Sequence, residues 1–210
     1  MLDKGNYCLY CGKSFGRIDK HLEAVHRDIV RVRRMITMED AKERKNLTLI
    51  RNKGNDTHNK EVLENGRGEL HVARVPDEDD NDPSNFVPCH ICQLWVSKVR
   101  LTRHKCTDKT KRPSLIVSKG LVLAAKKGYT EGMVKVLSEL AEDELGRLTR
   151  RDSLLLAVLH HQTKSGLWVM RKWRDQARIR LRYGARLLLR MQETFPGQDL
   201  RALVTAKTSS

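Results

Sequence analysis

The sequence predicts a mostly α-helical protein in which small C2H2-type zinc fingers of ββα form and a short β-hairpin precede a carboxyl-terminal all-α helical bundle. Three observations support this fold class. Two Cys-x2-Cys pairs are followed by further ligand-type residues, an Asn-Gly pair separates two short segments with apolar residues, and apolar residues from position 114 onward recur at helical intervals. With 39% hydrophobic and 5% aromatic residues in 210 positions, the chain supports one medium core, and metal must hold its smaller parts.

Residues 1–28 are predicted to form a C2H2-type zinc finger. Two thiolates on a tight knuckle are followed by two imidazoles at near-helical spacing, and Zn²⁺ favours this tetrahedral set of sulfur and nitrogen donors. The four predicted ligands are Cys8, Cys11, His21 and His26. Tyr7, Phe15 and Ile18 occupy the positions that form the small apolar core of such a finger. A core of this size does not fold alone, so we expect metal binding to supply the folding free energy.

Residues 29–76 are predicted to form a helix followed by a hairpin. Thr37 and Asp40 have the spacing of a capping pair, so the polar helix is expected to begin there and to run through about Asn52. Gly54 is the expected stop of this helix, since glycine is common just past helix ends.

The hairpin is expected between residues 60 and 75. Apolar Val62 and Leu63 precede Asn65-Gly66, which is a favoured two-residue hairpin turn, and Leu70 and Val72 alternate with polar neighbours after it. An acidic linker, residues 77–85, separates this hairpin from the next module.

A second zinc-finger-like module is predicted for residues 86–108, with Trp95 near the place of its aromatic anchor. Its predicted ligands are Cys89, Cys92, His104 and Cys106. Cys106 follows His104 by only two positions, and side chains two apart on a helix point to nearly opposite sides. Both reach one metal only if the helix ends at about His104 and the chain turns back. The alternatives are His90 as the fourth ligand or an open fourth position. The chain is thus expected to bind two Zn²⁺ ions.

The rest of the chain is predicted to be a basic hinge at residues 109–113, a helical bundle at 114–195 and a flexible tail at 196–210. The expected helices span about 114–127, 130–140, 142–149, 152–163 and 167–193.

Turn and capping residues set the borders of these helices. Gly128 and Gly166 mark breaks between them, and Thr130 and Asp152 are the expected N-caps. Short loops of this kind join the helices of a bundle.

The last helix carries two stripes. The apolar stripe is expected to pack into the bundle and consists of Met170, Trp173, Ala177, Leu181, Gly184, Leu188 and Met191. The candidate nucleic-acid contacts of the second stripe are Arg174, Arg178, Arg182, Arg186 and Arg190. Cations four residues apart repel each other unless carboxylates or phosphates lie opposite. The arginines could therefore face phosphates or form ion pairs with acidic residues of the segment 142–152, and the sequence leaves both alternatives open.

The charge of the chain favours a polyanionic partner. It has 41 basic and 26 acidic side chains, a formal charge of +15, so we expect nucleic acid and in particular double-stranded DNA. Nine residues between Cys11 and His21 shorten the finger and remove positions that read bases. Lys13, Arg17 and Lys20 are therefore predicted to contact phosphates. All five cysteines belong to the two predicted metal sites, as expected in a reducing compartment, and we expect a nuclear protein.

Neither catalysis nor membrane insertion is expected. The sequence has no Gly-rich phosphate loop, no nucleophile elbow and no evident carboxylate pair, so we do not expect an enzyme. The longest apolar run, Leu154 to Leu159, is too short to cross a bilayer.

The order of several short motifs resembles the amino-terminal region of Crypton-type tyrosine recombinases, which are transposon-derived proteins. These motifs are the first finger, Leu49-Ile50-Arg51-Asn52-Lys53-Gly54-Asn55, His58-Asn59, Glu61-Val62-Leu63, Gly68-Glu69-Leu70, the Cys89/Cys92 pair, Leu101-x-Arg103-His104, Arg151-Asp152 and the segment 185–189. The resemblance covers nearly the whole chain and implies paired fingers ahead of a DNA-gripping helical domain. The catalytic residues of the family have no counterpart here, so the resemblance implies the non-catalytic targeting half. The family places three residues between the last His and Cys of the second finger, whereas this chain has one.

Two functions from different classes follow. The first is a zinc-dependent DNA-binding module in which fingers and bundle grip a duplex together. The second is a structural or protein-interaction module in which the bundle docks a protein partner. RNA binding is a weaker alternative because the sequence offers no aromatic stacking platform.

Overall fold

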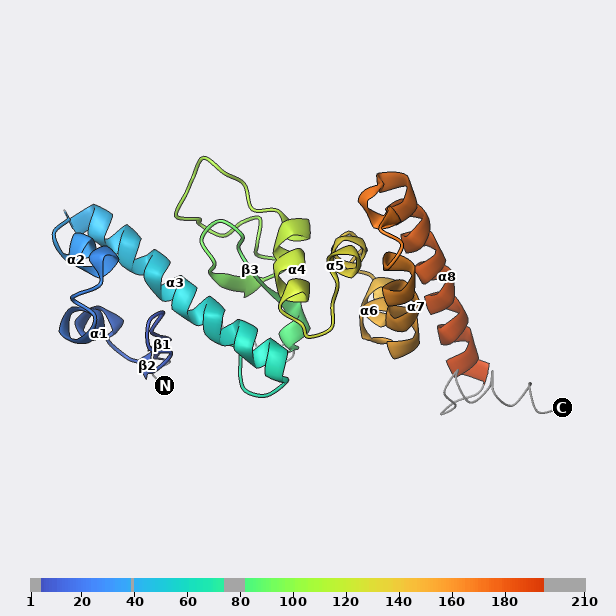
Figure 1. The fold of residues 1–210 in the computed structure, drawn as a ribbon, viewed down its shortest axis with the longest axis horizontal. Coiled ribbons are helices and arrows are strands. Elements are labelled where there is room, and N and C mark those ends of the chain that lie inside the picture. The colour runs from blue at the N-terminus through green and yellow to red at the C-terminus, as the bar shows by residue number, and fades with distance from the viewer. Residues whose placement is uncertain (1–4, 39, 74–81, 195–210) are drawn as a thin grey trace. The chain divides into compact units, whose positions relative to one another are not determined.

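The computed structural model describes residues 5–38, 40–73 and 82–194, and it divides into two compact units, residues 1–127 and 128–210 (Figure 1). The described residues are mostly helical and include two short antiparallel hairpins, which confirms the predicted fold class. No helix in these ranges is both long and apolar enough to span a membrane.

The first module has the order β, β, α. Strand β1 (Asn6–Tyr7) pairs antiparallel with β2 (Ser14–Phe15), and helix α1 (Ile18–Val25) follows. Ile18 of α1 is buried as expected, and Phe15 packs against the same core. The expected core position of Tyr7 was wrong, because its ring stacks on His58 at a centroid distance of 3.6 Å.

Helix α2 (Val30–Ile36) was not predicted. Its buried Val32 and Met35 join the core of the first module, which is therefore larger than that of an independent finger. The predicted capping role of Thr37 was wrong, since this residue ends α2 and its hydroxyl donates to the Arg34 carbonyl at 3.0 Å. A threonine hydroxyl bonds backbone at either end of a helix, and the sequence pattern does not distinguish the two.

Helix α3 (Asp40–Asn65) is much longer than predicted. Gly54, the expected stop, lies inside it. A Cβ atom at this position would lie 1.9 Å from the carbonyl oxygen of Tyr7. The glycine therefore permits close contact between α3 and the first module and does not end the helix.

The hairpin predicted between residues 60 and 75 was wrong. Residues 60–65 continue α3, and the described residues 66–73 contain no strand. Asn65-Gly66 ends the helix, with Gly66 at φ +65°, a backbone conformation common just past helix ends. Leu63 of the helix and Leu70 and Val72 of the segment after it instead pack in a cluster with Phe86 and Trp95. Most of the predicted acidic linker lies outside the described residues.

The second module is a hairpin closed by turns. After the short 3-10 turn η2 (Pro83–Asn85), strand β3 (Phe86–Pro88) pairs antiparallel with β4 (Trp95–Ser97). The helix expected before His104 is replaced by consecutive turns over residues 98–103, with backbone bonds such as Arg103 N–H to Arg100 O. The ββα form was therefore wrong for this module.

Helix α4 (Leu115–Ala124) begins at Ser114, whose hydroxyl accepts from the Val117 amide. It was expected to open the bundle, but Leu115 and Val122 pack against the core of the second module. The predicted start of the bundle at residue 114 was therefore wrong, because α4 belongs to the first unit.

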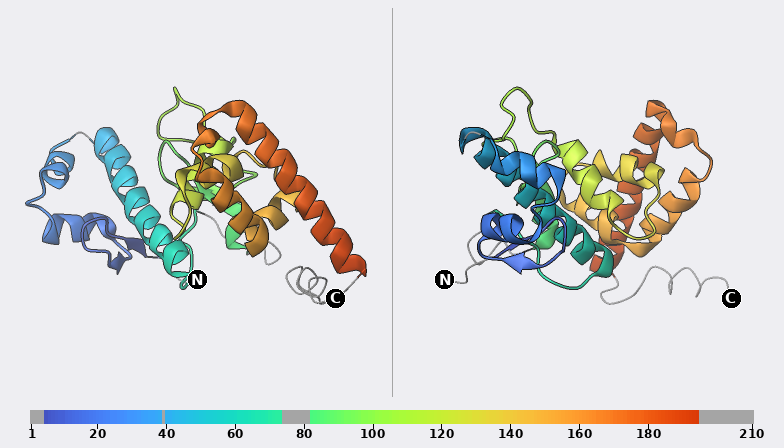
Figure 2. Two further views of the ribbon diagram at one scale, coloured as in Figure 1. Left: turned by 45° about the vertical axis from the view of Figure 1, so that its right-hand side comes forward. Right: turned by 60° about the vertical axis from the view of Figure 1, so that its left-hand side comes forward.

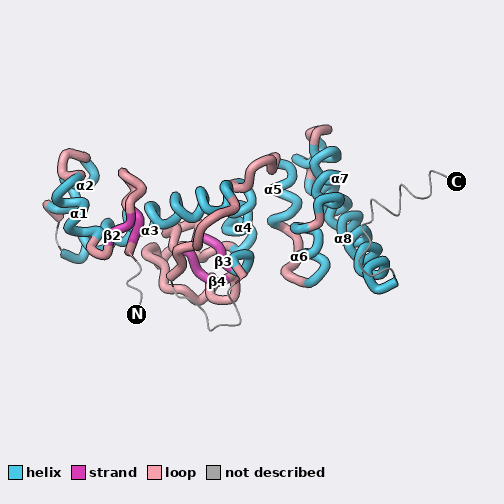
Figure 3. Tube along the Cα trace, turned by 90° about the horizontal axis from the view of Figure 1, so that it is seen from below, coloured by secondary structure: helices cyan, strands magenta, loops and turns pink. Residues whose placement is uncertain are grey.

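Neighbouring residues of α3 serve the cores of the two modules. Ile50 is fully buried in the first core, whereas Leu49 packs against the second. Successive residues of a helix differ by about 100° in direction, so one helix presents apolar contacts to both modules. Figure 3 shows α3 with the strands and helices of each module beside it.

The second unit is a helical bundle, seen from two further sides in Figure 2. Its elements are α5 (Glu131–Ser138), α6 (Glu144–Arg151), α7 (Ser153–Thr163), the 3-10 turn η3 (Leu167–Val169) and α8 (Arg171–Thr194). Thr130 and Asp152 are N-caps as predicted, and Gly128 and Gly166 lie between helices with positive φ.

The apolar stripe of α8 packs largely as predicted. Ala177, Leu181 and Leu188 are buried, and Ala185 joins them. Met170 differs, because 54% of its surface is exposed. The buried face of α8 is thus narrower at its start than the sequence pattern indicates.

Candidate metal centres

The first predicted metal site is built on a tight backbone knuckle. The Gly12 amide donates to the Cys8 carbonyl at 2.9 Å, and the Cys8 amide donates to the Lys13 carbonyl at 2.9 Å. Gly12 has φ +69°, which glycine adopts without strain. These bonds hold the two thiols of the Cys-x2-Cys pair on one side of the turn, facing α1.

The four predicted donors of this site converge. One donor atom from each of Cys8, Cys11, His21 and His26 lies within 4.8 Å of all the others. The Cys11 sulfur lies 3.4 Å from His21 Nε2. His26 Nε2 is buried and has no hydrogen-bond partner. A buried nitrogen of this kind is costly unless it binds something, and a metal at the centre of the cluster satisfies it.

Neighbouring rings hold the two imidazoles in place. Phe15 stacks on His21 at a centroid distance of 3.6 Å, and Tyr10 lies 5.4 Å from His26. Burial, together with the nearby His26, lowers the pKa of His21, so its neutral, metal-binding form is favoured. Burial raises the pKa of the Cys8 thiol, which must therefore release a proton when it binds metal.

The second site repeats the knuckle with a different residue at its tight position. The Gln93 amide donates to the Cys89 carbonyl at 2.7 Å, and the Cys89 amide donates to the Leu94 carbonyl at 2.9 Å. Gln93 has φ +59° and occupies the place of Gly12. A non-glycine residue in this region is strained by about 1 kcal/mol or more, so the contacts around it must stabilise the turn.

The fourth donor of the second site is Cys106 and not His90. One donor atom from each of Cys89, Cys92, His104 and Cys106 lies within 4.8 Å of the others. His90 is engaged elsewhere, since its Nδ1 accepts from the Ser114 amide at 3.3 Å. The turns over residues 98–103 replace a helix, and this change brings two side chains only two positions apart to one point.

The thiols of the second knuckle interact directly. A hydrogen bond from the Cys92 thiol, aided by backbone amides, lowers the pKa of Cys89 to about 4, while the same bond and burial raise that of Cys92. The low pKa of Cys89 favours its thiolate form, which is the form that binds a cation. Thiolate and imidazole donors in fours suit Zn²⁺.

Helix α3 binds the first module through backbone and amide contacts. The Tyr7 amide donates to Asn55 Oδ1 at 2.8 Å, and Asn55 Nδ2 donates to Asn6 Oδ1 at 3.0 Å. Gly54 lies directly against the backbone of the same strand. The strand that leads into Cys8 is thus fixed to α3.

The adjacent turns of α3 bind the second module in the same way. Asn52 Nδ2 donates to the carbonyl of the ligand Cys92 at 3.0 Å, and the Trp95 indole donates to Asp56 Oδ1 at 2.9 Å. Asn59 exchanges two bonds with the backbone of His71. These polar side chains of α3 are at least 94% buried. The segment 52–59 was therefore missed as a site, although its density of Asn residues inside a helix is a visible anomaly.

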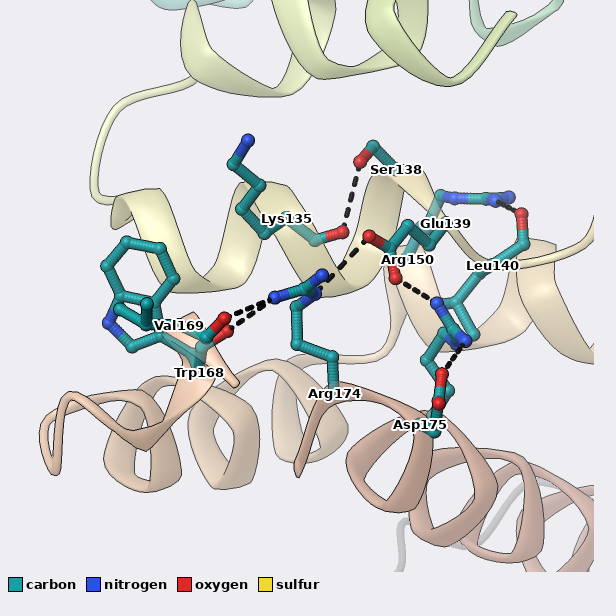
Figure 4. A network of polar contacts seen from close by, with 10 residues as sticks. Lys135, Ser138, Glu139, Leu140, Arg150, Trp168, Val169, Arg174 and Asp175 are labelled. Atoms are coloured by element: carbon teal, nitrogen blue, oxygen red, sulfur yellow. Dashed lines mark hydrogen bonds and ion pairs between the residues drawn. The ribbon is translucent and has the colours of Figure 1, made fainter. Parts of the chain in front are cut away.

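The arginine stripe of α8 divides into two groups. Arg174 Nε donates to Glu139 at 3.3 Å, and Arg178 pairs with both Glu139 and Asp175. Arg174 also donates to the carbonyls of Trp168 and Val169 in η3, as Figure 4 shows. Arg182 makes a two-pronged pair with Asp143 at 3.0 and 2.6 Å.

Arg174, Arg178 and Arg182 therefore pair with carboxylates of the same unit, which is the ion-pair alternative, and their contact with phosphates stays a prediction. The Arg182 pair, with the Gly146 amide, lowers the pKa of Asp143 to about 2. Arg186 and Arg190 remain exposed, and among the described residues neither pairs with a carboxylate.

The candidate phosphate contacts of the first finger lie at its surface. Lys13, Arg17 and Lys20 are exposed, although Arg17 lies 3.7 Å from Asp19 and Lys20 lies 3.2 Å from Glu23. The unpredicted α2 region adds exposed cations that sequence reasoning missed: Arg27, Arg31 and Arg34. The apolar spacing of Val32, Met35 and Ile36 is the pattern that would have revealed this helix.

No family model, curated protein or solved structure matches this chain.

Proposed function

We propose that this chain is a zinc-dependent nucleic-acid-binding module that contacts double-stranded DNA through its first unit. The observation that carries the proposal is the pair of four-donor Cys/His clusters held on one helix, next to exposed cations. Zinc would fix the two knuckles, and α3 would hold them as one body. The resemblance to Crypton-type recombinases supports a nuclear, non-catalytic targeting role.

The basic surface of the first unit supports phosphate contacts. Arg27, Arg31 and Arg34 are exposed on and beside α2, and α2 contains no acidic residue. Lys13 and Arg17 add charge from the neighbouring finger. Neutralising phosphates with such residues releases counterions, so binding of this kind depends strongly on salt. Since the second module lacks a recognition helix, we expect backbone contacts to outweigh base readout.

The test is a duplex titration of the full chain by fluorescence anisotropy at several salt concentrations. The triple variant Arg27→Gln, Arg31→Gln and Arg34→Gln should reduce the log–log salt slope by about 2.7, since each lost phosphate contact removes about 0.9. Chelation by 1,10-phenanthroline should weaken binding and release two zinc ions per chain.

A matched control removes the same charge from the second unit. The variant Lys135→Gln, Lys164→Gln and Arg171→Gln alters three exposed cations and should leave the salt slope near its original value. An equal loss in both variants would mean that net charge alone attracts DNA. Full duplex binding after chelation would exclude a role for zinc.

A structural or protein-interaction module is the second candidate. The absence of an α-helix between β4 and His104 favours it, because classical fingers read bases from such a helix. No duplex binding even at low salt, combined with retained zinc, would select this alternative.

A further inference from the structure

Helix α8 carries an apolar stripe on the face opposite its buried one. Ile179, Tyr183 and Leu187 are four residues apart and are 45%, 63% and 55% exposed. Residues at this spacing lie one above the other on a helix. A contiguous stripe of large apolar side chains, unlike a single exposed one, marks a surface that binds a partner.

The stripe is flanked by cations that the bundle leaves unpaired. Lys172, Arg180, Arg186 and Arg190 are exposed, and none forms an ion pair with another described residue. Arg186 lies over the Tyr183 ring at 5.6 Å. Arg174, Arg178 and Arg182 of α8 are already paired with carboxylates. The exposed face therefore combines apolar contacts with uncompensated positive charge.

A groove adjoins the start of this stripe. It has a volume of about 260 Å³ and is lined by Gln162, Met170, Lys172, Trp173, Gln176, Ala177 and Arg180. Met170, Trp173 and Ala177 make its lining largely apolar, and Lys172 and Arg180 belong to the cationic flank. Buried anchors in such grooves supply much of the binding energy of protein interfaces.

We infer that this face of α8 docks an acidic amphipathic helix of another protein. The helix would place apolar side chains along Ile179, Tyr183 and Leu187, insert one into the groove, and set its carboxylates against the flanking cations. From Met170 to Leu187 the surface extends about 26 Å at 1.5 Å per residue, so the partner needs about five helical turns.

Two other occupants fit the surface less well. DNA phosphates would pair with the arginines but would leave the stripe of aliphatic side chains without a contact. A second copy of the chain would bring the same unpaired cations together across a symmetric interface. On this face of α8 they would be opposed only by Glu193 near the helix end and by Asp175, which already pairs with Arg178.

The test uses the zinc-loaded full chain and a fluorescein-labelled 18-residue peptide. The peptide is a designed helix with Leu at positions three and four apart and Glu on both flanks. A scrambled peptide of the same composition is the reference. The designed peptide should bind at least about tenfold more tightly than the scrambled one, since only the first presents apolar residues on one face.

Surface variants locate the binding site. The double variant Tyr183→Ser and Leu187→Ser should weaken the affinity for the designed peptide at least about tenfold, as expected for central apolar contacts. Val99→Ser alters an aliphatic residue that is 81% exposed in the first unit and should have no effect. Because these positions are exposed, the variants should fold as the original does.

Each remaining outcome would overturn the inference. Equal binding of the designed and scrambled peptides would mean that the surface attracts acidic peptides by charge alone. If the double variant weakened the binding of duplex DNA and the peptide did not bind, this face of α8 would be a nucleic-acid-binding surface. If light scattering showed a dimer that the double variant dissociates, and the peptide did not bind, this face of α8 would be an interface between two copies of the chain. None of these results depends on whether the first unit binds DNA.

Discussion

Replacing Gly54 by alanine tests whether α3 holds the first metal module. A methyl group at Gly54 would lie 1.9 Å from the Tyr7 carbonyl oxygen and 2.9 Å from the Leu9 amide nitrogen. Both neighbours are backbone atoms, so no side-chain rotation relieves the overlap. The strand that leads into Cys8 must withdraw from the helix by roughly 1 Å or more to reach ordinary contact distance.

The expected cost follows from the bonds that this movement breaks. The Tyr7–Asn55 bond is 2.8 Å long and the Asn55–Asn6 bond is 3.0 Å, so neither survives such a shift. Two bonds contribute about 1 kcal/mol each, and a buried amide left unpaired costs about 1–3 kcal/mol more. Alanine returns about 1 kcal/mol through its higher helix propensity. The net loss is therefore about 2–4 kcal/mol.

Two measurements check this value. The melting temperature of zinc-loaded protein should fall by about 8–16 °C in the variant, given the size of the first unit. Hydrogen exchange of the Tyr7 amide should accelerate, because its partner moves away. Thr57→Ala is the matched control, since Thr57 is exposed on the same helix and its hydroxyl bonds only the Lys53 carbonyl.

The direction of the stability change distinguishes two roles of Gly54. If Gly54 were merely a poor helix residue, alanine would raise the stability as it does at exposed helical positions. A Gly54→Ala protein at least as stable as the original, with the Tyr7 amide still protected, would refute the close contact between helix and strand.

Three further predictions concern the knuckles and the bundle. Gln93→Gly should raise stability in urea unfolding by up to about 1 kcal/mol, because it relieves a left-handed backbone. Cys106→Ser should weaken the second zinc by more than about tenfold in competition with a chromophoric chelator, whereas His90→Ala should not. The folded pKa of Asp143, about 2, lies below its unfolded value, so its stabilisation is present above about pH 4 and is lost as the pH falls towards 2. Arg182→Gln should therefore destabilise the bundle at pH 6 but much less at pH 2.5 in thermal melts, and an equal loss at both values would contradict the pair.

The candidate metal ligands were predictable because their spacing is a local property. The knuckle and the distance to His21 and His26 depend only on a short segment, and the structure brings all four donors together. The bundle was predictable for the same reason, since caps such as Thr130 and Asp152 act within one turn. Cys106 was harder, because its role depends on turns that replaced an expected helix.

Contacts between distant segments were not predictable from spacing. The acidic partner of Arg174 and Arg178 is Glu139, which the sequence did not single out, because its position opposite α8 depends on the packing of α5. Gly54 and the Asn65-Gly66 pair have common meanings as helix stops and hairpin turns. Only the second ends a helix here, and the first instead serves a contact 47 positions away.

The polar character of α3 is explained by what it must hold. Apolar contacts such as those of Leu49 and Ile50 bind without fixing the register of the partner, since many sliding arrangements bury similar area. Buried amides lose about 1–3 kcal/mol when their partners shift, so Asn52, Asn55 and Asn59 penalise every arrangement except one. The bond from Asn52 ends on the backbone of Cys92, which is a candidate metal ligand. The bond between Asn55 and Tyr7 lies one residue before Cys8, which is a candidate ligand of the other cluster. A helix with a clean apolar stripe would bind both modules, but it would not set the two metal centres at a defined distance from each other.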